Sequence, residues 1–273
     1  MFSKSHSLLL VACGGSAIVA LGCVSFASAG TVYQDNFART GNLVGTSPSP
    51  VNSGAATWTG NFAANTVTAT TDGSELVLSQ VSYNGTAGGV SGAGYLPFTA
   101  PSSGTVTLSA NMEAGALSTG NSGTVAIGFG NPSLTPTLVL ASGTYNGDVG
   151  FYPNGYNNAA GQAQMKTMSS FSNGTFYNFS IDYNASTQTA QWSVDSGSGQ
   201  QLAGDTYTYT TAPTINGVET SLSSNSADTV PLVAEVQNFQ LTTAAVPEPA
   251  TLGVFALGGM GLLLASRKRK ARV

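Results

Sequence analysis

The chain has 273 residues, of which only 7% are charged and 34 are glycine, whereas an ordinary soluble domain has roughly 25% charged residues. Its one histidine, His6, and its two cysteines, Cys13 and Cys23, all lie in the first 23 residues. If that segment is removed on export, the mature protein lacks the side chains for a cysteine nucleophile, a Ser-His-Asp triad, a disulfide, or a zinc or haem site built on His or Cys. Helical bundles are also disfavoured, because their outer faces need charges.

The N-terminal residues have the features of a secretory signal. A short basic start precedes an apolar run over residues 8–24, and Ala27 and Ala29 occupy the two positions that a signal peptidase reads. Residues 1–29 are therefore predicted to be a signal peptide, with signal peptidase as the processing enzyme. Two alternatives stay open: a permanent N-terminal membrane helix and a lipoprotein signal.

Residues 30–245 are predicted to form one acidic domain. They contain eleven acidic residues but only two basic ones, Arg39 and Lys166, a net charge of −9 that the cationic C-terminus hides in the whole-chain value of −4. Nucleic-acid binding is excluded, since it needs a basic surface.

Alternation of apolar and polar residues dominates this domain and predicts β-strands. In residues 177–183, for example, Tyr177, Phe179, Ile181 and Tyr183 alternate with polar side chains, and a hairpin turn is predicted at 184–187. The predicted strands are Thr31–Phe37, Glu75–Val81, Thr105–Met112, Val125–Phe129, Thr137–Ala141, Val149–Tyr152, Tyr177–Tyr183, Ala190–Asp195, Thr206–Thr211 and Val230–Thr242. Many short strands without a convincing helix indicate an all-β fold, a single antiparallel β-sandwich.

Three segments of the domain resemble parts of the concanavalin A-like (lectin/glucanase, laminin-G-like) jelly rolls. Residues 35–39 resemble the opening strand of that fold, residues 176–195 its central hairpin, and residues 236–241 its closing strand. The resemblance implies a jelly-roll sandwich in which the closing strand lies beside the opening one. A generic sandwich of another topology is the alternative.

The C-terminus has three consecutive parts. Pro247, Glu248 and Pro249 come first, residues 250–266 follow without a charge, and a basic tail ends the chain. A helix of 17 residues spans about 25 Å, slightly less than the roughly 30 Å hydrocarbon core of a bilayer, and basic side chains can snorkel to close the gap. Residues 250–266 are thus a predicted transmembrane segment, with the basic tail in the cytoplasm. The stop-transfer cluster consists of Arg267, Lys268, Arg269, Lys270 and Arg272.

This order of parts over residues 246–273 resembles the PEP-CTERM sorting signal. The resemblance implies that an exosortase recognises Pro247, Glu248 and Pro249, removes the tail, and transfers the protein to the cell surface or extracellular matrix. It further implies a Gram-negative-type bacterium that makes exopolysaccharide, which becomes a candidate partner.

The clearest candidate binding residues lie in a predicted loop over residues 151–158. Tyr152, Asn154, Tyr156 and Asn157 combine rings that can stack on sugar C–H groups with amides that can hydrogen-bond sugar hydroxyls. The alternative is that the two tyrosines only cap the sandwich. Trp192 alternates with core positions and is predicted to be buried.

Neither a catalytic site nor a cofactor is predicted. Glucanases on this fold use a Glu-x-Asp-x-x-Glu strand, which this chain lacks, although carboxylates from different strands could still meet. Asp35, Asp148 and loop carbonyls offer oxygen ligands for calcium, but without EF-hand spacing.

Three functional hypotheses follow. The first is an exported, non-catalytic surface or matrix protein that associates with polysaccharide, in adhesion or a biofilm matrix. The second is a carbohydrate-active hydrolase, and the third is a structural coat protein without a ligand.

Overall fold

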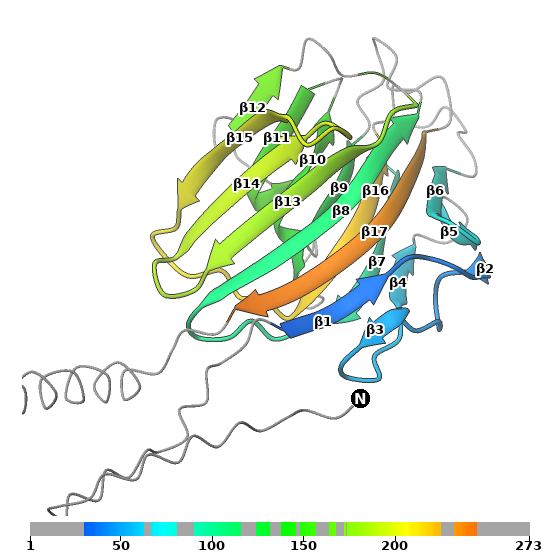
Figure 1. Ribbon diagram of the computed structural model, residues 1–273, viewed down its shortest axis with the longest axis horizontal. Helices are drawn as coiled ribbons and strands as arrows, with labels where there is room; N and C mark the ends of the chain where they lie inside the picture. The colour runs from blue at the N-terminus through cyan, green and yellow to red at the C-terminus, as the bar shows by residue number, and fades with distance from the viewer. Residues whose placement is uncertain are drawn as a thin grey trace, which may run out of the picture. The chain divides into compact units, whose positions relative to one another are not determined.

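The computed structural model describes residues 30–62, 67–80, 90–115, 124–131, 138–145, 148–156, 164–167, 172, 174–224 and 232–244. All regular elements in these ranges are β-strands (Figure 1), which confirms the predicted all-β class. A search of the same ranges for a helix long and apolar enough to cross a bilayer finds none. The predicted signal peptide, transmembrane segment and basic tail lie outside the described residues.

The strands form two antiparallel sheets. In the larger sheet the order is β15 (Gln201–Thr208), β14 (Thr189–Asp195), β13 (Tyr177–Asn184), β8 (Thr105–Gly115), β17 (Val233–Ala244), β6 (Leu76–Gln80), β5 (Val67–Asp72) and β2 (Thr40–Asn42), while β1 (Gly30–Asp35) pairs with both β17 and β3 (Pro50–Asn52). In the smaller sheet the order is β12 (Gln164–Thr167), β11 (Asp148–Tyr156), β10 (Leu138–Tyr145), β9 (Thr124–Gly130), β16 (Gly217–Ser224), β7 (Val90–Pro97) and β4 (Thr59–Phe62).

The expected neighbourhood of the first and last strands is confirmed. Tyr33 of β1 lies opposite Leu241 of β17, and the two strands run side by side in Figure 1. The predicted hairpin is confirmed as well, because the Asn184 side-chain oxygen accepts hydrogen bonds from the backbone N–H groups of Ser186 (2.9 Å) and Thr187 (3.1 Å). This cap closes the turn between β13 and β14.

The core lies between the sheets, where alternate side chains of the larger sheet meet those of the smaller one. On β13, Tyr177, Phe179, Ile181 and Tyr183 are buried while the residues between them are only half-buried. Trp192 is buried as predicted, and its ring stacks on that of Phe151 from the other sheet, with centroids 6.4 Å apart and planes 9° apart. Because Phe, Ile and Leu side chains contribute roughly 2 kcal/mol each on burial, this interface is the main source of stability.

Several strands were not predicted, and burial on both faces explains the clearest case. Residues 217–222 of β16, which pairs with the predicted strand β9, are all buried. Strands buried on both sides lose the polar alternation by which a half-buried strand is recognised. The predicted strand Val149–Tyr152 is confirmed, but it is longer than predicted, because residues 153–156 of the predicted loop also belong to strand β11.

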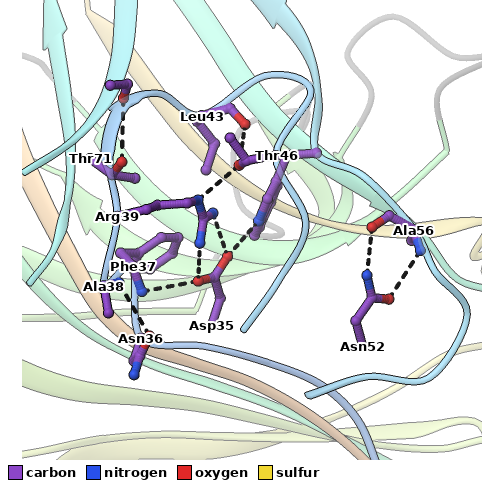
Figure 2. Close-up of polar contacts among 12 residues, drawn as sticks. Asp35, Asn36, Phe37, Ala38, Arg39, Leu43, Thr46, Asn52, Ala56 and Thr71 are labelled. Atoms are coloured by element: carbon purple, nitrogen blue, oxygen red, sulfur yellow. Dashed lines mark hydrogen bonds and ion pairs between the residues drawn. The ribbon is translucent and has the colours of Figure 1, made fainter. Parts of the chain in front are cut away.

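A buried carboxylate joins the first strand to the rest of the sandwich. Asp35 ends β1 and is fully buried. Its two oxygens accept hydrogen bonds from Nη1 and Nη2 of Arg39, both at 2.7 Å, and from the backbone N–H of Phe37 at 2.9 Å (Figure 2). A fourth hydrogen bond comes from the indole Nε1 of Trp58 at 2.7 Å, just before β4 of the smaller sheet. One side chain therefore links the two sheets.

Close packing surrounds this carboxylate. The ring of Trp58 meets that of Phe239 edge-on, with centroids 5.2 Å apart. A Cβ added to Gly94 would lie 2.8 Å from Leu43 Cδ2 and 3.4 Å from Trp58 Cε3. The absence of a side chain at Gly94 thus lets Leu43 and Trp58 pack directly on the smaller sheet.

Replacing Asp35 with Asn should destabilise the fold by about 3 kcal/mol, because it leaves a largely buried guanidinium without its ion pair and removes an acceptor from buried N–H donors. The free energy of unfolding from urea titration measures this effect. Asp195→Asn is the matched control, a half-buried carboxylate on the outer face of the larger sheet, and should change stability by under about 0.5 kcal/mol. Equal effects of the two substitutions would contradict the assigned role of Asp35.

Candidate functional site

The structure places the candidate carbohydrate-binding residues on β11 or beyond it. Tyr152 is buried, with 8% of its surface exposed. Asn154 and Tyr156 lie in the same strand, and Asn157 falls outside the described residues. Their role in binding sugars stays a prediction.

A different place in the fold gathers polar side chains around a hollow. A depression of about 300 Å³ lies at one end of the outer face of the larger sheet. Its lining combines two amides, a carboxylate, a hydroxyl, an aromatic ring and two glycines, namely Asn111, Asn178, Asp195, Ser196, Phe176, Gly197 and Gly199.

Strand register brings the polar members of this lining into one row. Asn178 of β13 lies opposite Asn111 of β8 on one side and opposite Asp195 of β14 on the other. Gln237 of β17 lies opposite Asn111 and extends the row to a fourth strand. Paired residues of an antiparallel sheet share a face, so the four side chains point to the same, outer side.

The hydrogen bonds within the row leave some of its donor and acceptor groups free to bind a ligand. Nδ2 of Asn178 donates to Oδ1 of Asn111 at 3.0 Å. An amide pair joined by one such bond still has an unused oxygen and an unused NH₂ group, whichever way the two amides are flipped. The Asp195 carboxylate makes no side-chain hydrogen bond or ion pair to any described residue. The depression therefore offers free acceptors, one donor group and the half-buried ring of Phe176.

A tight turn forms the wall beside Asp195. The backbone N–H of Gly199 donates to the carbonyl of Ser196 at 2.8 Å, and the N–H of Ser196 donates to the carbonyl of Gln200 at 2.8 Å. Gly199 adopts φ +80°, a left-handed conformation that glycine takes without strain. The wall is thus held by its own backbone hydrogen bonds.

Acidic side chains gather next to the row, where β6, β8 and β17 adjoin. Glu235 lies opposite Glu113, and Glu75 accepts a hydrogen bond at 2.8 Å from Nε2 of Gln237. Partial burial raises the pKa of Glu235, and the negative charges of Glu75, Glu113 and Asp72 and a hydrogen bond with Glu75 raise it further. These carboxylates destabilise one another at neutral pH.

The arrangement of these acids differs from that of a glycoside hydrolase. Hydrolysis needs two carboxyl groups about 5–9.5 Å apart on opposite sides of the scissile bond. Glu75, which directly precedes β6, and Glu235 of the neighbouring strand β17 instead contact each other on one sheet face. Glu219, a buried acid, lies on the other sheet, where a Cβ on Gly130 would overlap its carboxylate.

Burial, together with the charge of Glu219 and with Tyr33, raises the pKa of nearby Tyr95 to about 12.

Among the described residues, no group of three or more His, Cys, Asp or Glu side chains is arranged to hold a metal ion. Asp35, one of the two candidate oxygen ligands for calcium, uses its carboxylate for the four hydrogen bonds described above. Asp148 begins β11 in the smaller sheet.

The sequence predicts that the residues of the row lie on polar strand faces, but it does not predict that they lie next to one another. The alternation pattern assigns Asn111, Asn178 and Asp195 to polar strand faces, as the structure has them. Their meeting depends on the pairing of β8, β13 and β14 in a register that no local pattern specifies. Phe176 precedes its strand, and no sequence signal marks it.

Comparison with protein families finds one match, to the PEP-CTERM protein-sorting motif over residues 245–270. The end of the chain thus carries this sorting motif, as predicted, and such a motif is typical of exported proteins. No curated protein matches the chain in sequence.

Solved structures with a similar fold are numerous. The CBM2 module of the evolved Dit of Lactobacillus casei BL23 phage J-1 matches with a TM-score of 0.52 and 14% identity, covering 80% of this chain and 97% of that one. The lectin UEA-II complexed with galactose matches with a TM-score of 0.51 and 11% identity, covering 81% and 100%. The VIP36 exoplasmic/lumenal domain, in its Ca²⁺/Man₃GlcNAc-bound form, matches with a TM-score of 0.50 and 8% identity, covering 69% and 84%. The concanavalin A-like, lectin-like fold is confirmed; identities this low show the fold alone.

Acidification should stabilise the protein. The pKa of Glu235 is higher in the folded than in the unfolded state, so its protonation favours folding, and stability should rise as pH falls from 7 towards the ordinary pKa of a glutamate. Urea unfolding midpoints at pH 7 and pH 5 test this, and Glu235→Gln should raise the midpoint at pH 7 and reduce the gain on acidification. Asp195→Asn, which removes one charge from the same face, should keep that gain; a gain unchanged in Glu235→Gln would refute the assignment.

Proposed function

We propose that this chain is an exported, non-catalytic protein whose β-sandwich binds carbohydrate in the depression at the end of the larger sheet. The observation that carries the proposal is the row of Asn111, Asn178 and Asp195 beside the ring of Phe176. The sorting motif supports the exported part. The fold supports carbohydrate binding, since the lectin UEA-II, which shares the fold, is solved with galactose and the VIP36 domain is solved with Man₃GlcNAc.

The chemistry of the lining suits a saccharide. Sugar rings present apolar C–H faces that pack on aromatic rings, and hydroxyl groups that pair with amides and carboxylates. Among the residues whose burial the structure describes, Val44 is the one large apolar side chain that is exposed. A surface so poor in apolar side chains favours a polar ligand over a hydrophobic protein partner. Hydrogen-bonded amides on adjacent strands form a rigid support, which lowers the entropic cost of binding.

Processing and destination form the finer part of the proposal. Signal peptidase would act after Ala29, and an exosortase would recognise Pro247, Glu248 and Pro249 after the following segment had entered the membrane transiently. The freed domain would then act at the cell surface or in the matrix of a Gram-negative-type bacterium, with exopolysaccharide as its ligand. Tyr152, Asn154, Tyr156 and Asn157 remain a second candidate surface.

Asn178→Ala should weaken glycan binding about tenfold, because it removes an amide that accepts or donates at the centre of the row and frees its partner Asn111; two hydrogen bonds of about 0.7 kcal/mol each account for that factor. Affinities are measured by calorimetry with a ligand identified on a glycan array. Gln191→Ala, on β14 and on the outer face, is the control that should bind normally. No binding to any glycan by folded wild-type protein would reject the proposal.

Replacing Pro247, Glu248 and Pro249 with alanine should block removal of the C-terminal tail in the organism that makes the protein. Intact-mass measurement of the membrane and surface fractions is the assay. The wild-type chain is expected at the surface without its tail, and the variant in the membrane with it. Pro213→Ala, within the domain, should be processed like the wild type; normal processing of the triple variant would refute recognition of this motif.

A further inference from the structure

The outer face of the larger sheet is negatively charged without compensation. Six carboxylates lie on this face, those of Asp72, Glu75, Glu113, Asp182, Asp195 and Glu235. In residues 30–245 only Arg39 and Lys166 are basic. Arg39 is paired with Asp35, and Lys166 lies on β12 of the other sheet. A ligand that approaches the depression therefore meets a field of one sign, which attracts cations and repels anions.

The depression itself has more acceptors than donors. The hydrogen-bonded pair of Asn111 and Asn178 leaves one oxygen and one NH₂ group. Asp195 adds two carboxylate oxygens that have no hydrogen bond to a described residue. Gln237, the next residue of the row after Asn111, adds no free donor, because its NH₂ group already donates to Glu75. A matching ligand must supply donors, and an ammonium group supplies three of them together with the complementary charge.

From these two observations we infer that the depression takes a cationic amino-sugar unit, with its ammonium group on the Asp195 carboxylate, its hydroxyls on Asn111 and Asn178, and one face of its ring on Phe176. The ligand class is a polysaccharide with free amino groups rather than a neutral or uronic-acid polymer. This inference rests on the proposed function and adds the charge of the ligand to it.

Each part of the site has a separate role in this selection. Asp195 recognises the amine, because a charge-assisted hydrogen bond is about twice as strong as a neutral one. Asn111 and Asn178 hold any sugar with suitable hydroxyls and therefore do not discriminate by charge. The remaining carboxylates of the face act at a distance and attract the polymer in a salt-dependent way.

The test compares two oligosaccharides with the same backbone and length. The full-length chain, in detergent, is titrated with glucosamine hexamer and with N-acetylglucosamine hexamer at pH 6 by calorimetry. We expect the glucosamine hexamer to bind about tenfold more tightly at low salt. A polyuronate hexamer, with and without calcium, is the third probe and should not bind in either condition.

Two substitutions separate a direct contact from the general field. Asp195→Asn should reduce the tenfold preference to about threefold or less while binding of the N-acetylated hexamer stays unchanged. Asp182→Asn removes the same charge from the same face, away from the depression, where Asp182 accepts a hydrogen bond from Thr107 at 2.6 Å, and should keep most of the preference. In 1 M salt the screening length is about 3 Å, so the attraction of the distant carboxylates is removed. The preference for the glucosamine hexamer that remains is then due to the direct contact with Asp195.

The outcomes also separate this inference from the proposed function. Equal or tighter binding of the N-acetylated hexamer would overturn the inference and leave carbohydrate binding standing. Polyuronate binding that depends on calcium would overturn it in favour of a cation-bridged anionic ligand. Binding of none of the probes would overturn the inference, and a further lack of binding to every glycan on an array would overturn the proposed function as well.

Discussion

The hydrogen-bonded carboxylate of Asp35 determines how the two sheets are joined. A carboxylate that is fully buried costs several kcal/mol unless its oxygens are paired. Here the donors come from the chain just beyond β1 and from Trp58 at the entry to β4, so the pairing is complete only when the first strand of the larger sheet and the first of the smaller sheet are both in place. The same Trp58 packs against Phe239 of the closing strand. Residues 30–245 contain no cysteine, so no disulfide can stabilise this domain. Its stability therefore depends on this hydrogen-bond network and on the apolar interface.

The packing of the larger sheet fixes the positions of the side chains on its outer face. Its inner face is committed to the core, so its strands can neither slip by one residue nor rotate without exposing a row of rings. Because the strands cannot shift, Asn111, Asn178 and Asp195 are held in one row on the outer face, although they are far apart in sequence. A site on paired strands is positioned more accurately than one on a loop, which suits recognition by several weak contacts.

The acidic character of the domain has opposite consequences for stability and for function. The group around Glu235 opposes folding at neutral pH, as its raised pKa indicates. The same charges create the field that, in our inference, selects an amine-bearing ligand. Natural sites commonly retain such locally unfavourable charge where it serves binding. A cationic polymer lying along this face would relieve the repulsion, so binding and stability should be coupled through the same carboxylates.

Local sequence patterns were sufficient for the sorting motif, the all-β class, the burial of Trp192 and the 184–187 turn, because each depends on residues that are neighbours in the chain. Alternation in β13 and β14 even assigned Asn178 and Asp195 to the polar face. The tertiary structure decided what those faces meet. Strand β16 was missed because burial on both sides removes the alternation of polar and apolar residues, and residues 153–156 proved to continue strand β11 where a loop was predicted. The row and its depression arise from the pairing of β8, β13, β14 and β17, and long-range pairing is set by the whole core rather than by any local run of residues.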